Sequence, residues 1–167
     1  MNGEVDLHLH STASDGTVPP AEVVRRVAEA GLEGLSLTDH DTVDGLEEAS
    51  RAADELGLRF LPGAELSANE PERSVHVLAF GFDPEDPGLQ DFFRAYREDR
   101  VRRAKEIAER FRSLGVPLEY ESVREEAGRG VPTRAHVARA LVREGLVPDE
   151  RTVFGKYLSR GTPAFVE

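Results

Sequence analysis

The strongest constraint on the fold is a regular alternation of strand-like and helix-like segments over the first 82 residues. Short apolar segments bounded by turn residues predict strands, and apolar residues that recur every three or four positions predict helices. The expected strands span 5–10, 34–40, 58–66 and 74–82, and the expected helices between them span 20–30 and 43–56. This alternation indicates an α/β fold with a parallel sheet.

Residues 87–158 lack strand signals and predict helices only. Apolar residues at spacings of three, four or their multiples indicate one long amphipathic helix, which Gly115 and Pro117 end. Shorter helices are expected near 119–127, 133–144 and 149–158. Thr133 is the expected N-cap of the second of these, and residues 161–167 could begin a return to the sheet.

Four strands cannot close a parallel barrel, for which roughly 250 residues is typical. A parallel sheet that stops halfway leaves unpaired backbone groups and an exposed apolar face. We therefore expect the natural protein to continue beyond Glu167, or a second copy to cover the gap by self-association through the incomplete barrel.

Composition excludes several classes of protein. Apolar residues make up 39% and charged residues 32%, which is typical of a globular chain, and no apolar run approaches the roughly 18 residues of a membrane span. The N-terminal sequence lacks the features of a signal peptide, so a cytoplasmic location is expected. Cysteine is absent, so any metal must be held by His, Asp or Glu.

Charge divides the chain into two parts. Residues 1–91 carry 5 Lys and Arg against 20 Asp and Glu, whereas residues 92–160 carry 16 against 11. One interpretation is an acidic part that holds cations and a basic part that meets an anionic substrate; the other is an acidic surface plus one Arg-rich helix.

Titratable side chains gather where the expected strands end. His8 and His10 are two residues apart on a strand, so both imidazoles point to one face and can converge on one ion. The remaining members of the set are Asp15, Asp39, His40, Asp41, Glu65 and His76. Each residue alone fits an ordinary core, surface or helix-capping role, but their concurrence at successive strand ends favours a metal site.

Four motifs occur in order: HLHSTASDGT, LTDHDT, PGAELSA and VHVLAFGFD. This series resembles the motifs of the PHP (polymerase and histidinol phosphatase) superfamily of metal-dependent phosphoesterases. The branch it resembles most contains stand-alone proteins that hydrolyse nucleoside 3′,5′-bisphosphates and short RNA from the 5′ end. In that branch a helical insertion follows the fourth strand, and VPTRAHVARALVREGLV with FGKYLSRGTPAFV is similar to it.

The resemblance implies a partial, distorted, TIM-like β/α barrel, incomplete in this chain, with an all-helical insertion domain. Residues 1–87 would form the N-terminal part of the barrel and carry the metal motifs. Residues 88–160 would form the insertion, acting as a lid over the substrate, and residues 161–167 would begin the return to the barrel.

The resemblance also implies a site for two to three divalent transition metals, Mn, Fe or Zn. The implied ligands are His8 and His10 for the first ion, Glu65 as the bridge to the second, His76 for the second, and Asp15 and His40 for the third. The family completes this centre with a later His and with an Asp and a His near the end of the barrel, whereas the only His after His76 here is His136. Asp39 or Asp41 would orient a ligand imidazole or cap a helix.

Arg134 lies at an expected helix start, where the helix N-terminus and a guanidinium could together hold a phosphate. Arg160 and Lys156 are further candidates for phosphate contacts, and an ordinary surface charge is the alternative for each. Aromatic residues make up only 7%, which argues against an extended stacking platform, so a small nucleotide or a short oligonucleotide is the expected substrate.

The expected reaction is hydrolysis of a phosphate ester by metal-activated water. The sequence offers no Cys, and no Ser in the context of a nucleophile elbow, so no protein nucleophile is expected. Two alternatives are a histidinol-phosphate phosphatase and a truncated, non-catalytic metal-binding fragment.

Overall fold

The computed structural model describes residues 3–70, 73–128 and 130–166. The chain divides into two compact units, Met1–Arg97 and Glu98–Glu167. Each has its own apolar core. The first unit is mixed α/β, which confirms the predicted fold class at that level, and the second is helical.

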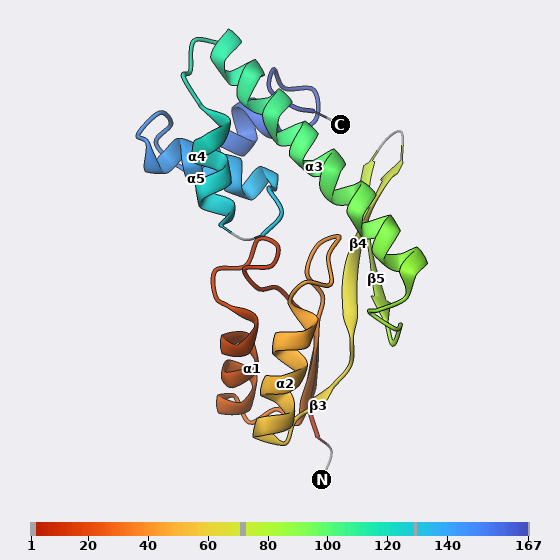
Figure 1. Cartoon of the computed structure of the whole chain (residues 1–167). Coiled ribbons are helices and arrows are strands. Elements are labelled where there is room, and N and C mark those ends of the chain that lie inside the picture. The colour runs from red at the N-terminus through yellow and green to blue at the C-terminus, as the bar shows by residue number, and fades with distance from the viewer. Residues whose placement is uncertain (1–2, 71–72, 129, 167) are drawn as a thin grey trace. The chain divides into compact units, whose positions relative to one another are not determined.

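The first unit is built on a three-stranded parallel sheet in the order β1-β2-β3. Its strands and helices are β1 (Val5–Leu9), α1 (Pro20–Glu29), β2 (Gly34–Leu37), α2 (Leu46–Leu56) and β3 (Arg59–Phe60). Helices α1 and α2 lie side by side (Figure 1) and bury their apolar faces with β2 in one core. The sequence predicted both helices within a few residues of their bounds.

Local sequence explains how α1 and α2 begin and end. Pro20 occupies the first turn of α1, where a missing backbone N–H costs nothing. The apolar stripe of α1, Val23, Val24 and Val27, is buried. Gly57 ends α2 with a φ of 68°, a left-handed conformation that glycine adopts without the usual steric cost.

The predicted strand 58–66 is wrong as a single strand, and the fourth strand is not parallel. The chain breaks at Pro62, and β4 (Gly63–Glu70) pairs antiparallel with β5 (Arg73–Phe80). Parallel pairing needs a crossover of about a dozen residues or more, and the short connection between these strands permits only a hairpin. An isolated parallel bridge between His40 and Glu65 joins β4 to the chain that follows β2.

Gly63 allows β4 to approach β2 closely. A Cβ atom at this position would lie 2.2 Å from Ser36 Oγ and 2.8 Å from Thr38 Cγ2. A larger residue would displace these two side chains, so glycine suits the position where the hairpin meets the parallel sheet.

The second unit contains most of α3 (Pro87–Ser113), together with α4 (Tyr120–Ala127), α5 (Arg134–Arg143), α6 (Glu150–Val153) and a π-helix (Phe154–Leu158). The predicted long helix and its end at Gly115 are confirmed, with a φ of 81° at that glycine. The predicted N-cap is also confirmed, because the Thr133 hydroxyl accepts a hydrogen bond from the backbone of His136. Phe111, Leu118 and Leu141 are buried in the core of this unit.

Residues 161–166, in the segment predicted to begin a return to the sheet, are turn and irregular structure, and Glu167 lies outside the described residues. Over the ranges that the structure covers, no helix has the length and apolar character needed to cross a membrane.

Candidate metal centre

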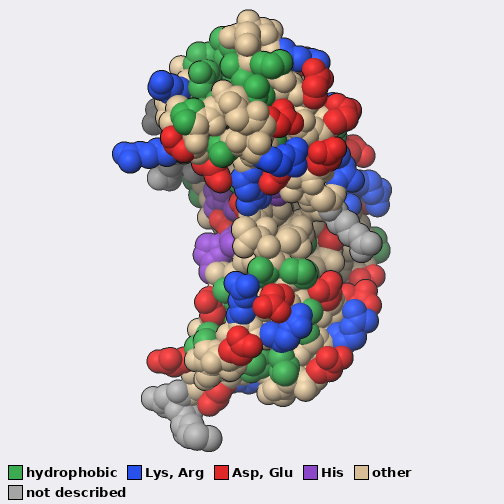
Figure 2. Space-filling model, turned by 90° about the vertical axis from the view of Figure 1, so that its left-hand side faces the viewer, with side chains coloured by type: hydrophobic (Ala, Val, Ile, Leu, Met, Phe, Trp, Pro, Cys, Tyr) green, Lys and Arg blue, Asp and Glu red, His purple; other side chains and the backbone are tan. Residues whose placement is uncertain are grey.

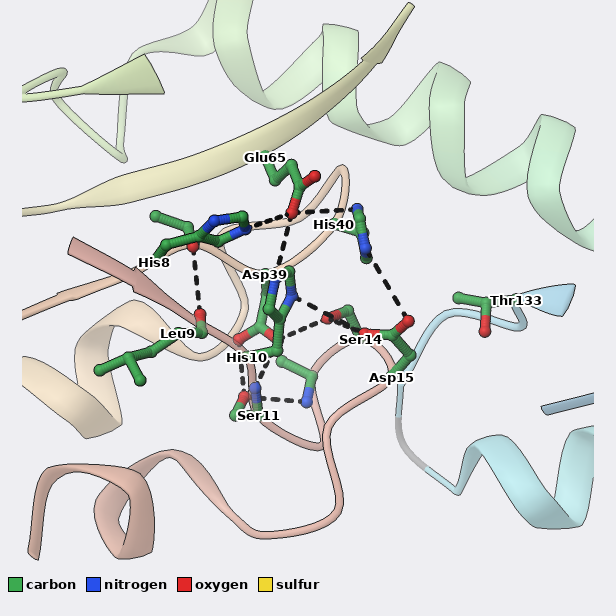
Figure 3. Close-up of polar contacts among 12 residues, drawn as sticks. His8, Leu9, His10, Ser11, Ser14, Asp15, Asp39, His40, Glu65 and Thr133 are labelled. Atoms are coloured by element: carbon green, nitrogen blue, oxygen red, sulfur yellow. Dashed lines mark hydrogen bonds and ion pairs between the residues drawn. The ribbon is translucent and has the colours of Figure 1, made fainter. Parts of the chain in front are cut away.

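His8 on β1 and His10, directly after its end, point to the same side, as their spacing predicts. His8 Nε2 lies 2.8 Å from Glu65 Oε2, and His10 Nε2 lies 3.0 Å from the same oxygen. Half of the His8 side chain is exposed, whereas that of Glu65 is buried. Figure 3 shows both imidazoles directed at this carboxylate.

Glu65 is held from both sides by the backbone. Its N–H donates to the carbonyl of Asp39 at 3.2 Å, and its carbonyl accepts from the N–H of Asp41 at 3.0 Å. On the neighbouring strand, His76 Nδ1 lies 2.7 Å from Glu65 Oε1. The two oxygens of Glu65 therefore face different imidazoles, which is the geometry of a carboxylate that can bridge two ions.

Asp15 and His40 complete the cluster at longer distances. Asp15 Oδ1 lies 3.7 Å from His10 Nδ1, and Asp15 Oδ2 lies 3.8 Å from His40 Nε2. His40 Nδ1 is 3.7 Å from Glu65 Oε2. These separations exceed hydrogen-bond length.

Three overlapping groups of side chains could each hold a metal ion, with the ligand atoms of each group within 4.8 Å of one another. The groups are His8–His10–Glu65, His10–Asp15–His40 and His40–Glu65–His76. The structure thus brings together all six residues that the sequence suggested as ligands. The His8 and His76 side chains are 50% and 39% exposed, so the cluster is open to solvent. Histidine atoms are visible on the surface in Figure 2 (purple).

The donor set fits divalent transition metals. Within the described part of the chain, His10 Nδ1 is buried and makes no hydrogen bond, as expected of a nitrogen reserved for an ion. Burial raises the pKa of Glu65. The hydrogen bond from His8 and the attraction of the other three imidazoles lower the pKa by more than burial raises it, so it lies below its ordinary value. Mixed imidazole and carboxylate ligands suit Mn, Fe or Zn better than Mg or Ca.

Asp39 and Asp41 are buried on either side of His40. The Asp39 carboxylate accepts hydrogen bonds from Ser11 and Ser14, and Asp41 Oδ1 accepts one from the backbone N–H of Ser67 at 2.7 Å. These contacts reach the chain segments that carry candidate ligands. The predicted role of either carboxylate in orienting an imidazole stays a prediction.

The candidate phosphate contacts lie in the second unit. Arg134 is the first residue of α5, and its guanidinium lies 5.3 Å from the centre of the Phe165 ring. Burial and the nearby Arg103 and Arg100 lower the pKa of Arg134 below its ordinary range, so positive charge is concentrated there. Lys156 in the π-helix and Arg160 in the following turn are exposed.

Sequence reasoning missed Ser11 and Ser14, which are fully buried and bonded to Asp39. The Ser- and Thr-rich turn after His10 was the available signal, but such turns are usually exposed. It also missed Phe165 as the ring beneath Arg134, because no local pattern connects positions so far apart.

An α/β unit that gathers four imidazoles and two carboxylates into groups able to hold ions is typical of metal-dependent hydrolases. The comparison with protein families agrees: residues 6–95 match the PHP domain. The chain belongs to the PHP domain family.

Two curated relatives align over almost the whole chain. The 5′-3′ exoribonuclease of Haemophilus influenzae is 39% identical over 167 residues, which cover 100% of this chain and 61% of the relative. The 3′,5′-nucleoside bisphosphate phosphatase of Chromobacterium violaceum is 39% identical over 163 residues, which cover 97% and 57%. The chain thus spans about three fifths of the length of these relatives.

Solved structures show the same fold. An amidohydrolase from Chromobacterium violaceum with bound sulfate has a TM-score of 0.90 and 38% identity, over 99% of this chain and 58% of that chain. A Bifidobacterium adolescentis protein assigned as a metal-dependent phosphoesterase has a TM-score of 0.89 and 34% identity, over 100% and 59%.

Proposed function

We propose that this chain carries the metal-binding part of a phosphoesterase that hydrolyses phosphate esters of small nucleotides or short oligonucleotides. The observation that carries the proposal is the position of Glu65, whose two oxygens face imidazoles from two different strands. The names of the relatives, a bisphosphate phosphatase and an exoribonuclease, support the substrate class.

Two to three ions would be held by the three groups around Glu65, His10 and His40. When bound, such ions lower the pKa of coordinated water and polarise a phosphoryl oxygen. Glu65 balances part of their charge, and its lowered pKa keeps it ionised at neutral pH. Because His8 and His76 are partly exposed, a substrate phosphate can approach the cluster from solvent.

Arg134, with weaker contributions from Arg160 and Lys156, would contact a phosphate group of the substrate. The support is the concentration of guanidinium groups near Arg134, which favours an anion, and the N-terminus of α5 at the same residue. The related Chromobacterium violaceum structure contains sulfate, an anion similar to phosphate.

The finer features of the fold belong to the same proposal. Residues 1–87 would form the first part of a PHP barrel, residues 88–160 a helical insertion that acts as a lid, and residues 161–167 the start of a return to the barrel. Val5 and Leu7 on β1 and Val77 on β5 are exposed, which supports further chain, or a second copy, covering these strands.

The decisive experiment measures phosphate release from adenosine 3′,5′-bisphosphate by the 167-residue chain with Mn²⁺. We expect release that chelation with EDTA abolishes and that added Mn²⁺ restores. The Glu47→Gln variant, which changes an exposed carboxylate on α2, is the matched control and should keep the activity. Failure to hydrolyse the bisphosphate, short RNA and aryl phosphates, by a chain that holds Mn²⁺, would contradict the proposal and favour a non-catalytic metal-binding fragment.

A parallel assay with histidinol phosphate separates the two enzyme classes. We expect the bisphosphate to be the better substrate, because the resemblance and the relatives point to nucleotides. Preference for histidinol phosphate would replace the proposed substrate class while leaving the metal centre in place.

A further inference from the structure

The segment 39–41 contacts the chain on both sides of the candidate metal centre. Its backbone flanks Glu65 through the two hydrogen bonds of the bridge to β4. Its middle residue, His40, is itself a candidate ligand. The side chains on either side of His40 reach other segments: that of Asp41 accepts from the backbone of Ser67, and that of Asp39 accepts from Ser11 and Ser14.

The Asp39 carboxylate is buried and accepts three hydrogen bonds (Figure 3). Oδ1 accepts from the Ser11 backbone N–H at 2.8 Å and from the Ser14 hydroxyl at 2.6 Å. Oδ2 accepts from the Ser11 hydroxyl at 2.6 Å. Burying a carboxylate is costly unless such donors compensate, so this arrangement strongly favours one position of the serines.

The turn held by Asp39 carries two candidate ligands. His10 precedes Ser11, and Asp15 follows Ser14. The turn is tied to itself, since the Ser11 carbonyl accepts from the N–H groups of Ser14 at 3.1 Å and Gly16 at 2.9 Å. A movement of Ser11 and Ser14 would therefore move both ligands.

Gly16 shows how little freedom this turn has. A Cβ atom at Gly16 would lie 2.6 Å from the carbonyl oxygen of His10. The last residue of the turn therefore packs directly on the backbone of His10, a candidate ligand. A turn packed in this way transmits a shift at one end to the other.

We propose that Asp39 is a positioning residue for the group His10–Asp15–His40: its carboxylate, acting through Ser11 and Ser14, sets where His10 and Asp15 lie relative to His40. The inference rests on the proposed metal centre. It separates the groups, because the loss of Asp39 would act on the two groups that contain His10, whereas the group His40–Glu65–His76 would keep its position.

The test compares Mn²⁺ binding by the wild-type chain and by Asp39→Asn, measured by isothermal titration and by equilibrium dialysis. Asn keeps the size of the side chain but loses the charge and one acceptor oxygen. We expect the class of Mn²⁺ site that depends on His10 to weaken by about 10- to 100-fold, the range found when groups that orient metal ligands are removed. The site formed by His40, Glu65 and His76 should be retained. Asp54→Asn, a change of an exposed carboxylate on α2, should leave all sites unchanged.

Ser14→Ala provides a second variant that leaves Asp39 charged and removes a single hydrogen bond. We expect a smaller loss at the same class of site, and the double variant should lose less than the sum of the single losses, because both changes break one linkage. Should Asp39→Asn fail to fold, as judged by thermal unfolding in EDTA, the Ser14→Ala result alone decides: a loss confined to one class of site supports the inference, and unchanged binding overturns it.

Two outcomes for Asp39→Asn overturn the inference. The first is Mn²⁺ binding equal to that of the wild type. The second is an equal loss of Mn²⁺ binding at every site, in proportion to the fraction of unfolded protein, which would show that Asp39 serves stability only. Asp15→Ala is the reference variant. If Asp15→Ala leaves Mn²⁺ binding unchanged, the proposed metal centre itself is wrong at this group, whatever Asp39→Asn does.

Discussion

The two units of the molecule use histidine in opposite ways. In the first unit, three imidazoles lie 2.7–3.0 Å from the carboxylate of Glu65. In the second unit, His136 is buried in the first turn of α5, and its Nδ1 accepts a hydrogen bond from the backbone N–H of Thr133 at 3.0 Å. A histidine whose ring closes a helix cap serves the fold, whereas histidines that share one carboxylate are arranged for an ion.

Within the second unit, the arginines differ in how their charge is balanced. Arginines along α3 pair with acids one turn away: Arg102 Nη2 lies 2.6 Å from Asp99, and Arg110 Nη2 lies 2.6 Å from Glu106. Such exposed pairs add little to stability, and their charges neutralise each other locally. Arg134 differs, because the charges that act on it most are those of other arginines. The excess of basic residues over 92–160 is therefore a weaker indication of anion binding than the position of Arg134.

The largest expected effect comes from removing the charge shared by the first unit's histidines. Glu65→Gln keeps the shape of the side chain but replaces one oxygen by an NH₂ group that cannot bind a cation. Because Glu65 belongs to two of the three candidate groups, Mn²⁺ affinity should fall by about a hundredfold or more, at or beyond the upper end for groups that only orient ligands. Isothermal titration with Mn²⁺ measures the change.

Glu47→Gln controls for the loss of a carboxylate, since Glu47 is exposed on α2. Glu65→Gln should unfold at a somewhat lower temperature than the wild type in EDTA, because the contacts with the imidazoles outweigh the cost of burying the carboxylate and are weakened in the variant. Mn²⁺ affinity is therefore measured at a temperature where both proteins are folded. Unchanged Mn²⁺ affinity in Glu65→Gln would show that the imidazoles of the first unit only form hydrogen bonds to a buried carboxylate. The histidines of the two units would then not differ in role.

Sequence patterns predicted those parts of the fold and site that depend on local spacing. The alternation at His8 and His10 placed both rings on one face, and the position of Thr133 before an apolar stripe predicted a helix cap. The hairpin of β4 and β5 was missed because a run of β-forming residues does not show the direction of pairing. The connection between Leu66 and Ser74, the ends of the two predicted strands, was too short for a crossover, and this length was the signal that could have corrected the prediction.

The partners of Asp39 could not be predicted for a different reason. Ser11 and Ser14 lie more than twenty residues away in the chain, and only the folded sheet brings them to this carboxylate. An Asp beside a candidate ligand is equally consistent with orienting that ligand, capping a helix or anchoring a distant turn, so the sequence left these alternatives open.

Removing His136 in the second unit should lower stability and leave Mn²⁺ affinity unchanged, whereas removing a histidine of the metal centre should do the opposite. His136→Ala loses the ring that closes the capping box with Thr133 and leaves a cavity in a buried site, so the chain should lose about 2 kcal/mol of stability. Its Mn²⁺ affinity should not change. Chemical denaturation in EDTA and Mn²⁺ titration measure the two effects separately.

The His76→Ala variant in the first unit is compared with His136→Ala in the same two measurements. The His76 side chain is 39% exposed, so its loss should cost little stability, but it belongs to a candidate metal group and Mn²⁺ affinity should fall. If His136→Ala weakened Mn²⁺ binding as much as His76→Ala, His136 would also serve the metal centre. A purely structural role for His136 would then be wrong.

The smallest expected effect tests whether the charge at Arg134 serves the substrate. A charge-assisted hydrogen bond to phosphate contributes about 1.5–3 kcal/mol, so Arg134→Ala should weaken binding of adenosine 3′,5′-bisphosphate by roughly tenfold or more. Turnover should fall less than affinity, because this contact lies outside the metal-ligand groups. Arg151→Ala, which removes an exposed arginine from α6, is the matched control and should bind normally. Equal affinities for Arg134→Ala and the wild type would show that the clustered guanidinium groups only stabilise the second unit, through the stacking of Arg134 on Phe165.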